Sequence, residues 1–506
     1  MFGGMRKGMM TNRRIPLLTK SRFVSGLQCL KMIHLDWYKN GTPSPVTQAQ
    51  QFIFDQGDRV GVLAQQRFPG GVLVDVAYYA REEAEEETQR LLADASVNVL
   101  YEASFRSHDV HVRCDILERH GDGTFGLIEV KSSTSAKSQY LPDIAVQLWV
   151  LEGAGLAVST AHLLHINREY VYPGGEYALD ELFNLVDVTE EARSVITDGL
   201  PQDAESMLRV LSDPETPDIP VGRHCKKPYT CAYYDHCHVG LPDHSVAQLP
   251  RAGEALLDKL DAAGIKDIRE IPDDFEGLSA SQQRVRDTLV GGESYVGAEL
   301  ARALGSVEYP LFFLDFETFN PGLPLFPGTR PYDLVLFQWS LHVRTDAGSE
   351  ETHAGFLAEG EEDPRGEFLK SLLEQIGPEG SIVVYSAFEA SRLRELAVLY
   401  PEHAGAIDGV ISRIVDLLTI VRDHVYHADF HGSYSLKAVL PALVPDLNYG
   451  DLEVQEGGGA SATFFAMRLL DPPSSERQTR YEALWEYCKR DTLAMVRVFD
   501  ALGELK

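Results

Sequence analysis

The amino-acid sequence predicts an α/β protein with two domains and a helical connector between them. Its 506 residues exceed what one hydrophobic core usually organises. Two short apolar runs, FGLIEV from Phe125 and LFFLDF from Leu311, have the length and composition of buried strands, and helical spacing of apolar residues follows each of them. We therefore expect domains at residues 1–245 and 306–506, with the connector at residues 246–305.

The first domain is expected to hold a mixed sheet beside a helix. The segment VHVRCDIL alternates as strands do, whereas DIAVQLWVLEGAG has helical spacing and a glycine stop. The strands carry Asp115, Glu129 and Lys131, and the last two share a face because they are two positions apart. Two acids that hold a divalent ion, beside a lysine that orients water, suit phosphodiester hydrolysis. An ordinary exposed strand is the alternative interpretation.

The six cysteines of the chain do not suggest a disulfide scaffold, because a chain of this length does not need one. Cys225, Cys231 and Cys237 are evenly spaced in HCKKPYTCAYYDHC, and Cys29 lies far upstream. The other two cysteines sit singly within predicted secondary structure. The spacing therefore singles out one group of four.

The sequence of the connector predicts mainly helices, with modest apolar content, from Arg251 to about Gly305. Its segment LDKLDAAGIKDIREI is either a plain helical spacer or a helix-hairpin-helix contact with DNA.

The second domain begins with a buried strand that carries Asp315 and Glu317 on one face. A long helix ends the chain, and Tyr487 and Asp491 share one face of it because they are four residues apart. Phosphodiester hydrolysis by two divalent ions about 3.5–4 Å apart needs such a carboxylate cluster and a group that positions water. We assign the water-positioning role to Tyr487. Without the helix, the strand acids alone would read equally well as an exposed strand end.

The formal net charge of −30 argues against a protein that coats nucleic acid nonspecifically. It leaves a nuclease possible, since metal-binding carboxylates are themselves negative and basic residues cluster between Arg6 and Arg22 and between Arg223 and Lys227. No stretch has the length and apolarity of a membrane span, and the N-terminal segment lacks a signal-peptide core. We expect no membrane partner and a cytoplasmic location.

The C-terminal motifs FLDFET and YCKRDT resemble those of DEDD exonucleases of the RNase H-like fold, in the subgroup whose last motif is Tyr-x-x-x-Asp. The resemblance implies a further acid, Glu389 in YSAFEASRL, where Tyr385 or Ser386 replaces the usual asparagine. It also implies removal of nucleotides from a 3′ end with Mg²⁺ or Mn²⁺, held by Asp315, Glu317, Glu389 and Asp491. Other segments similar to this family contain Asp416, Tyr434, Ser435 and Lys437.

The N-terminal motifs resemble PD-(D/E)XK restriction-endonuclease-like nucleases of the RecB group, with Asp115 and Glu129 as metal ligands. The helix after the strands carries Asp143 and Gln147, which resembles the glutamine motif of that group. Two departures concern Leu151, where a tyrosine is expected, and the place of an early histidine. Relatives place this histidine four residues after a glycine, and in this chain Gly61 stands four residues after Gly57. Glu102 is a weak candidate to replace the histidine as a metal ligand.

The four spaced cysteines resemble the ligand set of iron–sulfur RecB-like exonucleases, including the CRISPR-associated type. The resemblance implies that Cys29, Cys225, Cys231 and Cys237 hold a [4Fe–4S] cluster. Zinc is the alternative, and unligated core cysteines are a further one. For zinc, three histidines nearby would add ligands: His224, His236 and His238.

Over nearly its full length the chain resembles a prokaryotic group of predicted RecB-family nucleases that ends in a domain of unknown function. The resemblance implies a nuclease of single-stranded DNA or DNA ends that acts in DNA processing, repair or defence. The C-terminal site would act at a 3′ end and the N-terminal site at a 5′ end. The alternatives are a nucleic-acid-binding or structural module with one degenerate half, an RNA-directed exonuclease, and a redox sensor.

Overall fold

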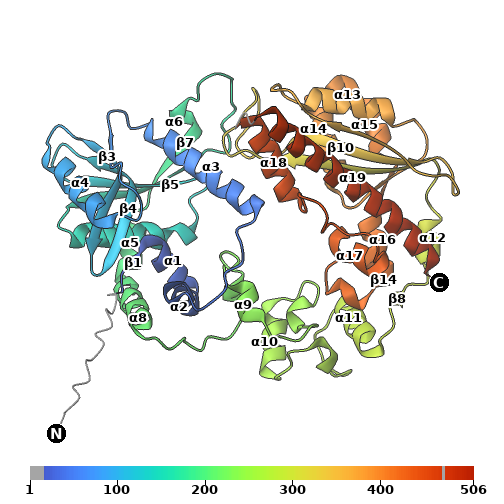
Figure 1. Ribbon diagram of the computed structural model, residues 1–506, viewed down its shortest axis with the longest axis horizontal. Helices are drawn as coiled ribbons and strands as arrows, with labels where there is room; N and C mark the ends of the chain where they lie inside the picture. The colour runs from blue at the N-terminus through green and yellow to red at the C-terminus, as the bar shows by residue number, and fades with distance from the viewer. Residues whose placement is uncertain (1–15, 470–472, 506) are drawn as a thin grey trace, which may run out of the picture. The chain divides into compact units, whose positions relative to one another are not determined.

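The computed structural model describes residues 16–469 and 473–505, and it has the mixed α/β class that the sequence predicts (Figure 1). Residues 6–15 of the basic cluster that begins at Arg6 lie outside the described residues. The described chain divides into two compact units. The first unit lies within Met1–Val46, Ile53–Val239 and Gly322–Tyr332. The second unit lies within Thr47–Phe52, Gly240–Pro321 and Asp333–Lys506.

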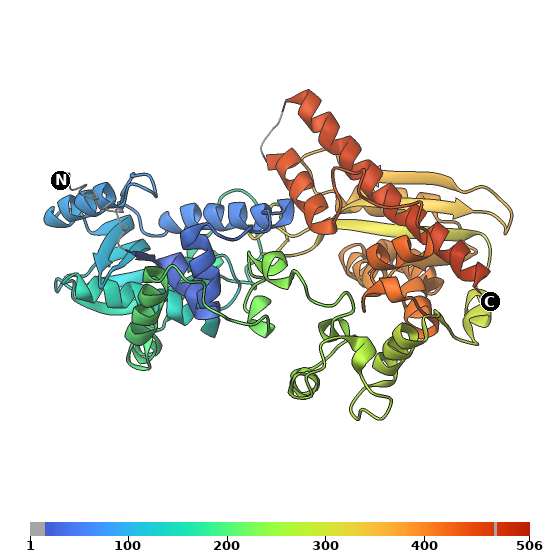
Figure 2. The ribbon, with the colours of Figure 1, turned by 60° about the horizontal axis from the view of Figure 1, so that its bottom comes forward.

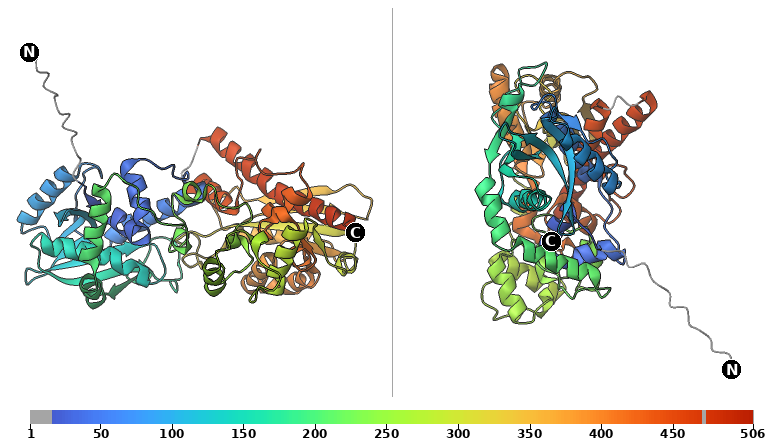
Figure 3. Two further views of the ribbon diagram at one scale, coloured as in Figure 1. Left: turned by 90° about the horizontal axis from the view of Figure 1, so that it is seen from below. Right: turned by 90° about the vertical axis from the view of Figure 1, so that its left-hand side faces the viewer.

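A twisted mixed sheet forms the centre of the first unit (Figure 3). Its strand order is β2-β3-β4-β5-β6-β7, and β1 pairs in parallel with β4. The segments VHVRCDIL and FGLIEV form β4 and β5, as predicted. The strands are β1 Leu18–Thr19, β2 Val72–Leu73, β3 Val99–Ser107, β4 Val110–Arg119, β5 Phe125–Lys131, β6 Val158–Ile166 and β7 Phe183–Asp187.

Helices pack on this sheet through apolar side chains. Helix α5 contacts β3, β4 and β6, and one core cluster joins it to residues such as Leu117 on β4 and Leu163 on β6. A second cluster joins Ile116 and Ile128 to Val60 of α3. The helices are α1 Lys20–Gln28, α2 Leu30–Tyr38, α3 Gln48–Gln65, α4 Arg81–Ala93, α5 Leu141–Gly153, α6 Leu179–Leu182, α7 Thr189–Thr197, α8 Leu200–Ser212 and α9 Tyr234–His238.

The second unit is built on a five-stranded sheet with the order β11-β10-β9-β12-β13. Strands β9, β10 and β11 are antiparallel neighbours, whereas β12 runs parallel to both β9 and β13. The strands are β8 Tyr295–Val296, β9 Leu311–Phe319, β10 Val335–Arg344, β11 Thr352–Leu357, β12 Ser381–Val384, β13 Ile414–Asp416 and β14 Val425–Tyr426, of which β8 and β14 form a separate pair.

Helices cover both faces of this sheet (Figure 2), and alternate residues of β9 face one layer or the other. Leu314 and Phe316 join a core cluster that includes Phe368 of α13 and Leu393 of α14. On the other side, α18 and α19 pack on β9. The predicted terminal helix is confirmed as α19, and the face that it buries includes Leu484, Tyr487, Cys488, Asp491 and Met495.

The stretch expected as a connector belongs to the second unit. It forms α10, α11, β8 and α12, and a turn at its start, which ends at Gln248, lies close to Gly432. A Cβ at Gly432 would lie 1.7 Å from the carbonyl oxygen of Gln248, and its φ of +77° favours glycine. The helices are α10 Glu254–Ala262, α11 Ala280–Gly291, α12 Leu300–Leu304, α13 Arg365–Gln375, α14 Phe388–Leu399, α15 Ala404–Ile411, α16 Leu417–His424, α17 Leu436–Leu443, α18 Gly457–Leu469 and α19 Ser474–Glu504.

Among the described residues, every helix is too short or too polar to cross a lipid bilayer.

Two buried histidines in the second unit should make its free energy of unfolding decrease at acidic pH. Burial lowers the pKa of His342 and of His353 to about 4, and their rings lie 4.7 Å apart. A folded-state pKa below the unfolded value favours the native state above pH 6.5, and this contribution is lost as the pH falls toward 4. We expect a His342→Gln/His353→Gln variant to lose roughly 3 kcal/mol less unfolding free energy than wild type between pH 7 and pH 5. Urea unfolding followed by tryptophan fluorescence measures this difference, and equal pH slopes would contradict it.

Candidate metal centre

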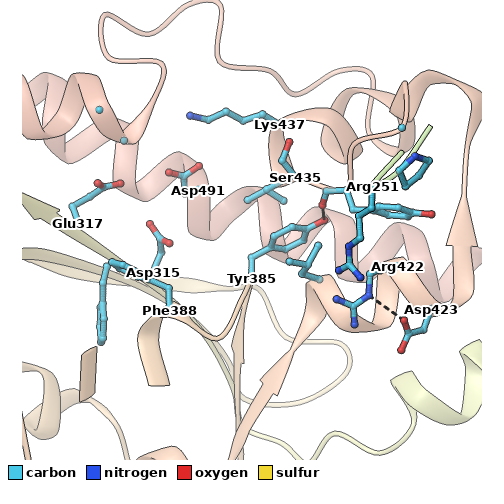
Figure 4. Close-up of a pocket in the computed structure, with 18 of the residues that line it drawn as sticks. Arg251, Asp315, Glu317, Tyr385, Phe388, Arg422, Asp423, Ser435, Lys437 and Asp491 are labelled. Carbon is cyan, nitrogen blue, oxygen red and sulfur yellow. Dashed lines mark hydrogen bonds and ion pairs between the residues drawn. The ribbon is translucent and has the colours of Figure 1, made fainter. Parts of the chain in front are cut away.

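Strand β9 and helix α19 bring three carboxylates to one end of a cavity in the second unit (Figure 4). Asp315 and Glu317 project from β9 on the side that α19 covers, and Asp491 projects from α19. The ladder between β9 and β10 runs through Asp315 and Glu317, so the backbone holds both acids firmly. The structure thus brings together the three acids that residue spacing alone predicts.

The fourth acid predicted for this cluster is Glu389. It lies in the first turn of α14, the helix that follows β12. It is only 3% exposed, and its Oε2 atom has no hydrogen-bond partner in the described part of the chain. Burial, with a smaller contribution from the charge of Asp416, raises its pKa to about 8. Its charge also raises the pKa values of Asp315 and Glu317, although Glu389 is not among the residues that line the cavity.

The residues at the usual asparagine position have structural partners. The Ser386 Oγ accepts a hydrogen bond of 3.0 Å from the backbone N–H of Phe388, at the start of α14. The Tyr385 hydroxyl donates to the carbonyl oxygen of Tyr434 at 3.0 Å. Asp416 caps α16 by accepting from Thr419. These side chains therefore support the backbone around the cluster.

The electrostatics of the cluster are those of negative charge without enough counter-charge. Burial raises the pKa of Asp315, and Asp491 and Glu317 raise it further. Burial likewise raises the pKa of Glu317, against the lowering effect of Lys437. Carboxylates forced together in this way favour either protons or a bound cation. The arrangement therefore fits divalent cations.

Tyr487 is oriented for hydrogen bonding rather than for proton abstraction. Its side chain is 3% exposed, and its hydroxyl oxygen accepts a hydrogen bond of 3.1 Å from the Lys437 ammonium. Burial raises the pKa of Tyr487, and the charge of Asp491 raises it further. The phenol therefore keeps its proton at neutral pH, and it can direct a water molecule but cannot act as a phenolate base.

Two members of this centre were not predicted from the sequence. The Tyr449 hydroxyl donates to Asp491 Oδ1 at 2.5 Å, and the Cys488 thiol donates to Asp315 Oδ2 at 3.6 Å. One possible ligand atom each from Asp315, Glu317 and Cys488 lies within 4.8 Å of the others. Cys488 follows Tyr487 directly and could have been found from its place on the helix. Tyr449 lies in a loop and carries no such signal.

The predicted N-terminal residues also converge, between β4, β5 and α5. Lys131 Nζ donates to Glu129 Oε1 at 2.7 Å and also contacts Asp143. Gln147 donates to Glu129 Oε2 at 2.7 Å. Asp115 accepts a hydrogen bond of 2.7 Å from the backbone N–H of Val130, just beyond the last paired residues of β4 and β5. Burial and, to a smaller extent, the charge of Glu129 together raise the pKa of Asp115 to about 7.

Lys20, at the start of α1, is an unpredicted member of this N-terminal group. Its ammonium donates to both carboxylate oxygens of Glu129, at 3.0 and 3.1 Å, and lies 3.9 Å from Asp143. Burial alone would raise the pKa of Glu129, but Lys20 and Lys131 together bring it below its usual range. The group thus carries three carboxylates and two ammonium groups. Its charge is largely neutralised by the chain itself, unlike that of the C-terminal cluster.

The structure shows what surrounds each residue at which the N-terminal motifs differ from those of RecB-like nucleases. Leu151 is fully buried in the core, where it packs as an apolar side chain. Gly57 and Gly61 lie on α3, with open space where a Cβ would stand. Glu102 pairs with Arg113 at 3.3 Å, and the β3–β4 register skips it at a positive φ of 57°. Burial raises the pKa of Glu102, against the lowering effect of Arg113.

The four cysteines singled out by their spacing line one small cavity of the first unit: Cys29, Cys225, Cys231 and Cys237. All of them are free thiols. Backbone N–H groups point at two of the sulfur atoms, from Gly222 to Cys225 and from Tyr233 to Cys231, each at 3.4 Å. Such N–H···S bonds are a means by which proteins tune iron–sulfur centres. The donor set therefore suits a thiolate-bound group.

The predicted histidine ligands are less well placed. His224 lines the cysteine cavity, with Nε2 at 3.7 Å from the Cys225 sulfur. His236 accepts from the Thr42 backbone, and His238 stacks on Tyr234. Within the described residues, no three thiol or imidazole ligands of this region come within 4.8 Å of one another. Tetrahedral zinc, with Zn–S near 2.3 Å, needs sulfur atoms roughly 3.8 Å apart.

Comparison with known proteins gives a family match for part of the second unit. Residues 312–435 match the family described as Domain of unknown function (DUF2779). That stretch includes Asp315, Glu317 and Glu389, and it ends before α19.

Individual relatives are distant. The uncharacterized protein MG366 homolog of Mycoplasma pneumoniae (strain ATCC 29342 / M129 / Subtype 1) is 26% identical over 208 residues, which are 37% of this chain and 31% of the relative. The match thus spans about a third of that relative's length. Among solved structures, one described as "Crystal structure of SSO0001" is 12% identical, with a TM-score of 0.19, over 39% of this chain and 78% of that one.

Proposed function

We propose that this protein is a metal-dependent nuclease whose C-terminal centre hydrolyses phosphodiester bonds. One observation carries the proposal: Asp315, Glu317 and Asp491 converge at the end of a cavity, near the buried Glu389, with Lys437 as the neighbouring cation. Carboxylates in this number and arrangement are the ligands that paired Mg²⁺ or Mn²⁺ ions use in phosphodiester hydrolysis.

The topology of the second unit supports an RNase H-like assignment for it. Three antiparallel strands followed by two parallel ones, in the order β11-β10-β9-β12-β13, match the layout expected of that fold. The first acids lie on the central strand and the last acid lies on the C-terminal helix. In the proposed enzyme this unit is a DEDD-type exonuclease that removes nucleotides from a 3′ end.

In the proposed reaction the bound divalent ions would polarise the phosphate and activate water. Asp315, Glu317, Asp491 and Glu389 would hold them. Tyr487 would direct the attacking water through its phenol, which Lys437 holds at 3.1 Å. Tyr449 would fix the Asp491 carboxylate by donating to Oδ1, leaving the other oxygen for a cation. Because Asp315 and Glu317 lie on a strand and Tyr487 and Asp491 lie on a long helix, these groups need little reorganisation before reaction.

The first unit is proposed to have a RecB-like PD-(D/E)XK architecture. The Asp115, Glu129 and Lys131 geometry and the glutamine on α5 support this assignment. The Lys20 ammonium favours a second candidate function for this half. Lys20 donates to both oxygens of Glu129. If it excludes the divalent ion, this half is a nucleic-acid-binding or structural module that has lost catalysis.

Replacing Lys20 by alanine tests this second candidate. The change removes the cation that now neutralises Glu129, so we expect the N-terminal group to gain divalent-ion affinity by about tenfold or more. Calorimetric titration of Mn²⁺ into the Lys20→Ala chain, with Asp315→Asn added to silence the other centre, measures the gain. Lys370→Ala, at an exposed lysine, is the control. Equal Mn²⁺ affinity with and without Lys20 would show that the lysine does not compete with a cation.

The cysteine cavity is proposed to hold a [4Fe–4S] cluster. Four free thiols around one cavity, and the N–H groups aimed at two of them, fit that group. The wide spacing of the described ligands favours it over a single zinc ion. Bound there, the cluster would tie α2 to the segment around α9, because Cys29 lies next to α2 and Cys237 lies on α9.

Turnover of end-labelled strands tests the proposed activity directly. Anaerobically purified protein is incubated with single-stranded DNA labelled at either end, with Mn²⁺ or EDTA, and the products are resolved over time. We expect Mn²⁺-dependent shortening that releases the 3′ label first. Single-stranded RNA of the same sequence is run in parallel, and faster RNA shortening would identify an RNA-directed exonuclease. Mobility shifts without shortening of either strand would establish the binding module instead.

A further inference from the structure

The cavity that holds the carboxylates at one end is basic at its other end. Its volume is about 1110 Å³, larger than a typical site for one small ligand. Figure 4 shows Asp315, Glu317 and Asp491 on one side and Arg251 and Arg422 on the other. Tyr385 and Ser435 lie between these two ends in the same view. One cavity therefore combines a cation-binding end with an anion-binding end.

The basic end is assembled from separate parts of the second unit. Arg251 precedes α10, Arg284 lies on α11, and Arg422 lies on α16. The Arg284 guanidinium donates to the carbonyl oxygens of Arg422 and Asp423, at 2.9 and 3.1 Å. It also stacks over the Tyr295 ring at 4.2 Å. Arg284 thus holds α11 against the end of α16 and keeps the arginines on one wall.

Two of these arginines keep hydrogen-bonding capacity for a ligand. Arg422 makes an ion pair of 3.2 Å with Asp423, but both side chains stay substantially exposed, at 39% and 53%. An exposed pair of this kind is weak and easily exchanged for a phosphate. Arg251 is exposed at the rim. In a chain of net charge −30, a cavity wall with three arginines marks a place where an anion is favoured.

We propose that Arg251 and Arg422, on a wall that Arg284 holds in place, form a subsite for the phosphodiester backbone of a single strand whose end reaches the carboxylate cluster. The inference rests on the proposed function, because the strand is the substrate of that centre. Phe388 lines the same cavity and offers an aromatic surface for a base. The segment expected as a connector would therefore help to hold the substrate directly through Arg251, and Arg284 would position the wall that carries Arg422.

The subsite predicts that substrate length matters. A chromogenic mononucleotide ester, the p-nitrophenyl ester of thymidine 5′-phosphate, is too short to reach the arginines, so Arg251→Ala/Arg422→Ala should hydrolyse it at the wild-type rate. For wild type, KM should fall as single-stranded oligonucleotides lengthen from two to about ten nucleotides. We expect the double variant to lose most of this gain, with KM about tenfold or more higher on the longest strands and kcat nearly unchanged. Arg284 is kept because its contacts are structural.

Binding measurements separate the subsite from the activity. In an Asp315→Asn background, fluorescence anisotropy of a labelled ten-nucleotide strand is measured at several salt concentrations. Each lost phosphate contact should reduce the slope of log K against log salt by about 0.7. Arg302→Ala, which removes an exposed arginine outside the cavity, is the matched control. Circular dichroism melting checks that all variants fold.

The outcomes are distinct. A lower slope and a lost length dependence in the double variant, but not in Arg302→Ala, would support the subsite. An unchanged slope and unchanged KM on long strands would overturn it, even if the enzyme hydrolyses the mononucleotide ester. If neither the ester nor any strand is hydrolysed, the proposed function fails, while a reduced salt slope would still uphold the arginine wall as a strand-binding surface.

Discussion

An Asp315→Asn variant is expected to lose Mn²⁺-dependent hydrolysis of single-stranded DNA by at least about 10³-fold, equivalent to about 4 kcal/mol of transition-state stabilisation. Burial raises the pKa of Asp315, and Asp491, Glu317 and Glu389 raise it further. Asparagine keeps the shape of the side chain but removes the negative charge that a divalent ion requires. Initial rates on end-labelled strands, at saturating Mn²⁺, measure the loss.

The same change should leave the fold intact. Since burial and neighbouring acids raise the pKa of Asp315, a neutral amide costs less at that place than a carboxylate when no cation is present. We expect the melting temperature in EDTA to be equal to or above that of wild type. Asp446→Asn, at an exposed surface acid, is the control and should retain full activity. Full activity in Asp315→Asn would place the active centre elsewhere.

Loss of one cavity cysteine is the second change with a large expected effect. We expect anaerobically purified wild-type protein to contain about four iron and four sulfide per chain and to absorb visible light, whereas a Cys231→Ser variant should contain little of either. Cys231 is 8% exposed. Burial raises the pKa of its thiol, and the other three thiols raise it by smaller amounts. Structural metal sites contribute on the order of 10 kcal/mol to folding, so the first unit should also unfold at lower denaturant.

Cys114 provides the matched control for this experiment. It is fully buried within β4, outside the cysteine cavity. A Cys114→Ala variant should keep the iron and sulfide content of wild type. Elemental analysis that finds one zinc per chain would show that the four cysteines bind zinc in place of an iron–sulfur cluster. Protein with neither metal, and with unchanged stability in Cys231→Ser, would show that the four thiols are simply core residues.

The acids of the C-terminal centre could be predicted because their spacing is locally rigid. A two-residue step on a strand and a four-residue step on a helix fix Asp315 beside Glu317 and Tyr487 beside Asp491, whatever the rest of the fold does. The same argument predicts that Glu129 and Lys131 meet, and they are 2.7 Å apart. Glu389 has no such partner in its segment, and only the family resemblance pointed to it.

The unpredicted residues reach their sites through tertiary structure. Tyr449 lies in a loop before α18, and its contact with Asp491 spans 42 residues of sequence. The local sequence around Lys20 indicates only the first residue of a helix capped by Thr19. Its contact with Glu129 spans 109 residues of sequence. Similarly, no periodicity in residues 246–305 indicates that Gly432 will pack against Gln248. Contacts of this kind depend on how whole elements dock, which local patterns do not encode.

The central claim is that the carboxylate cluster of the second unit binds paired divalent ions. Crystals of the full chain grown with Mn²⁺ and measured at the manganese absorption edge test it most directly. We predict two anomalous peaks about 3.5–4 Å apart, ligated by Asp315, Glu317 and Asp491, with Glu389 beside them. Crystals of a protein shown to be active in Mn²⁺, with no manganese at these acids, would contradict the claim.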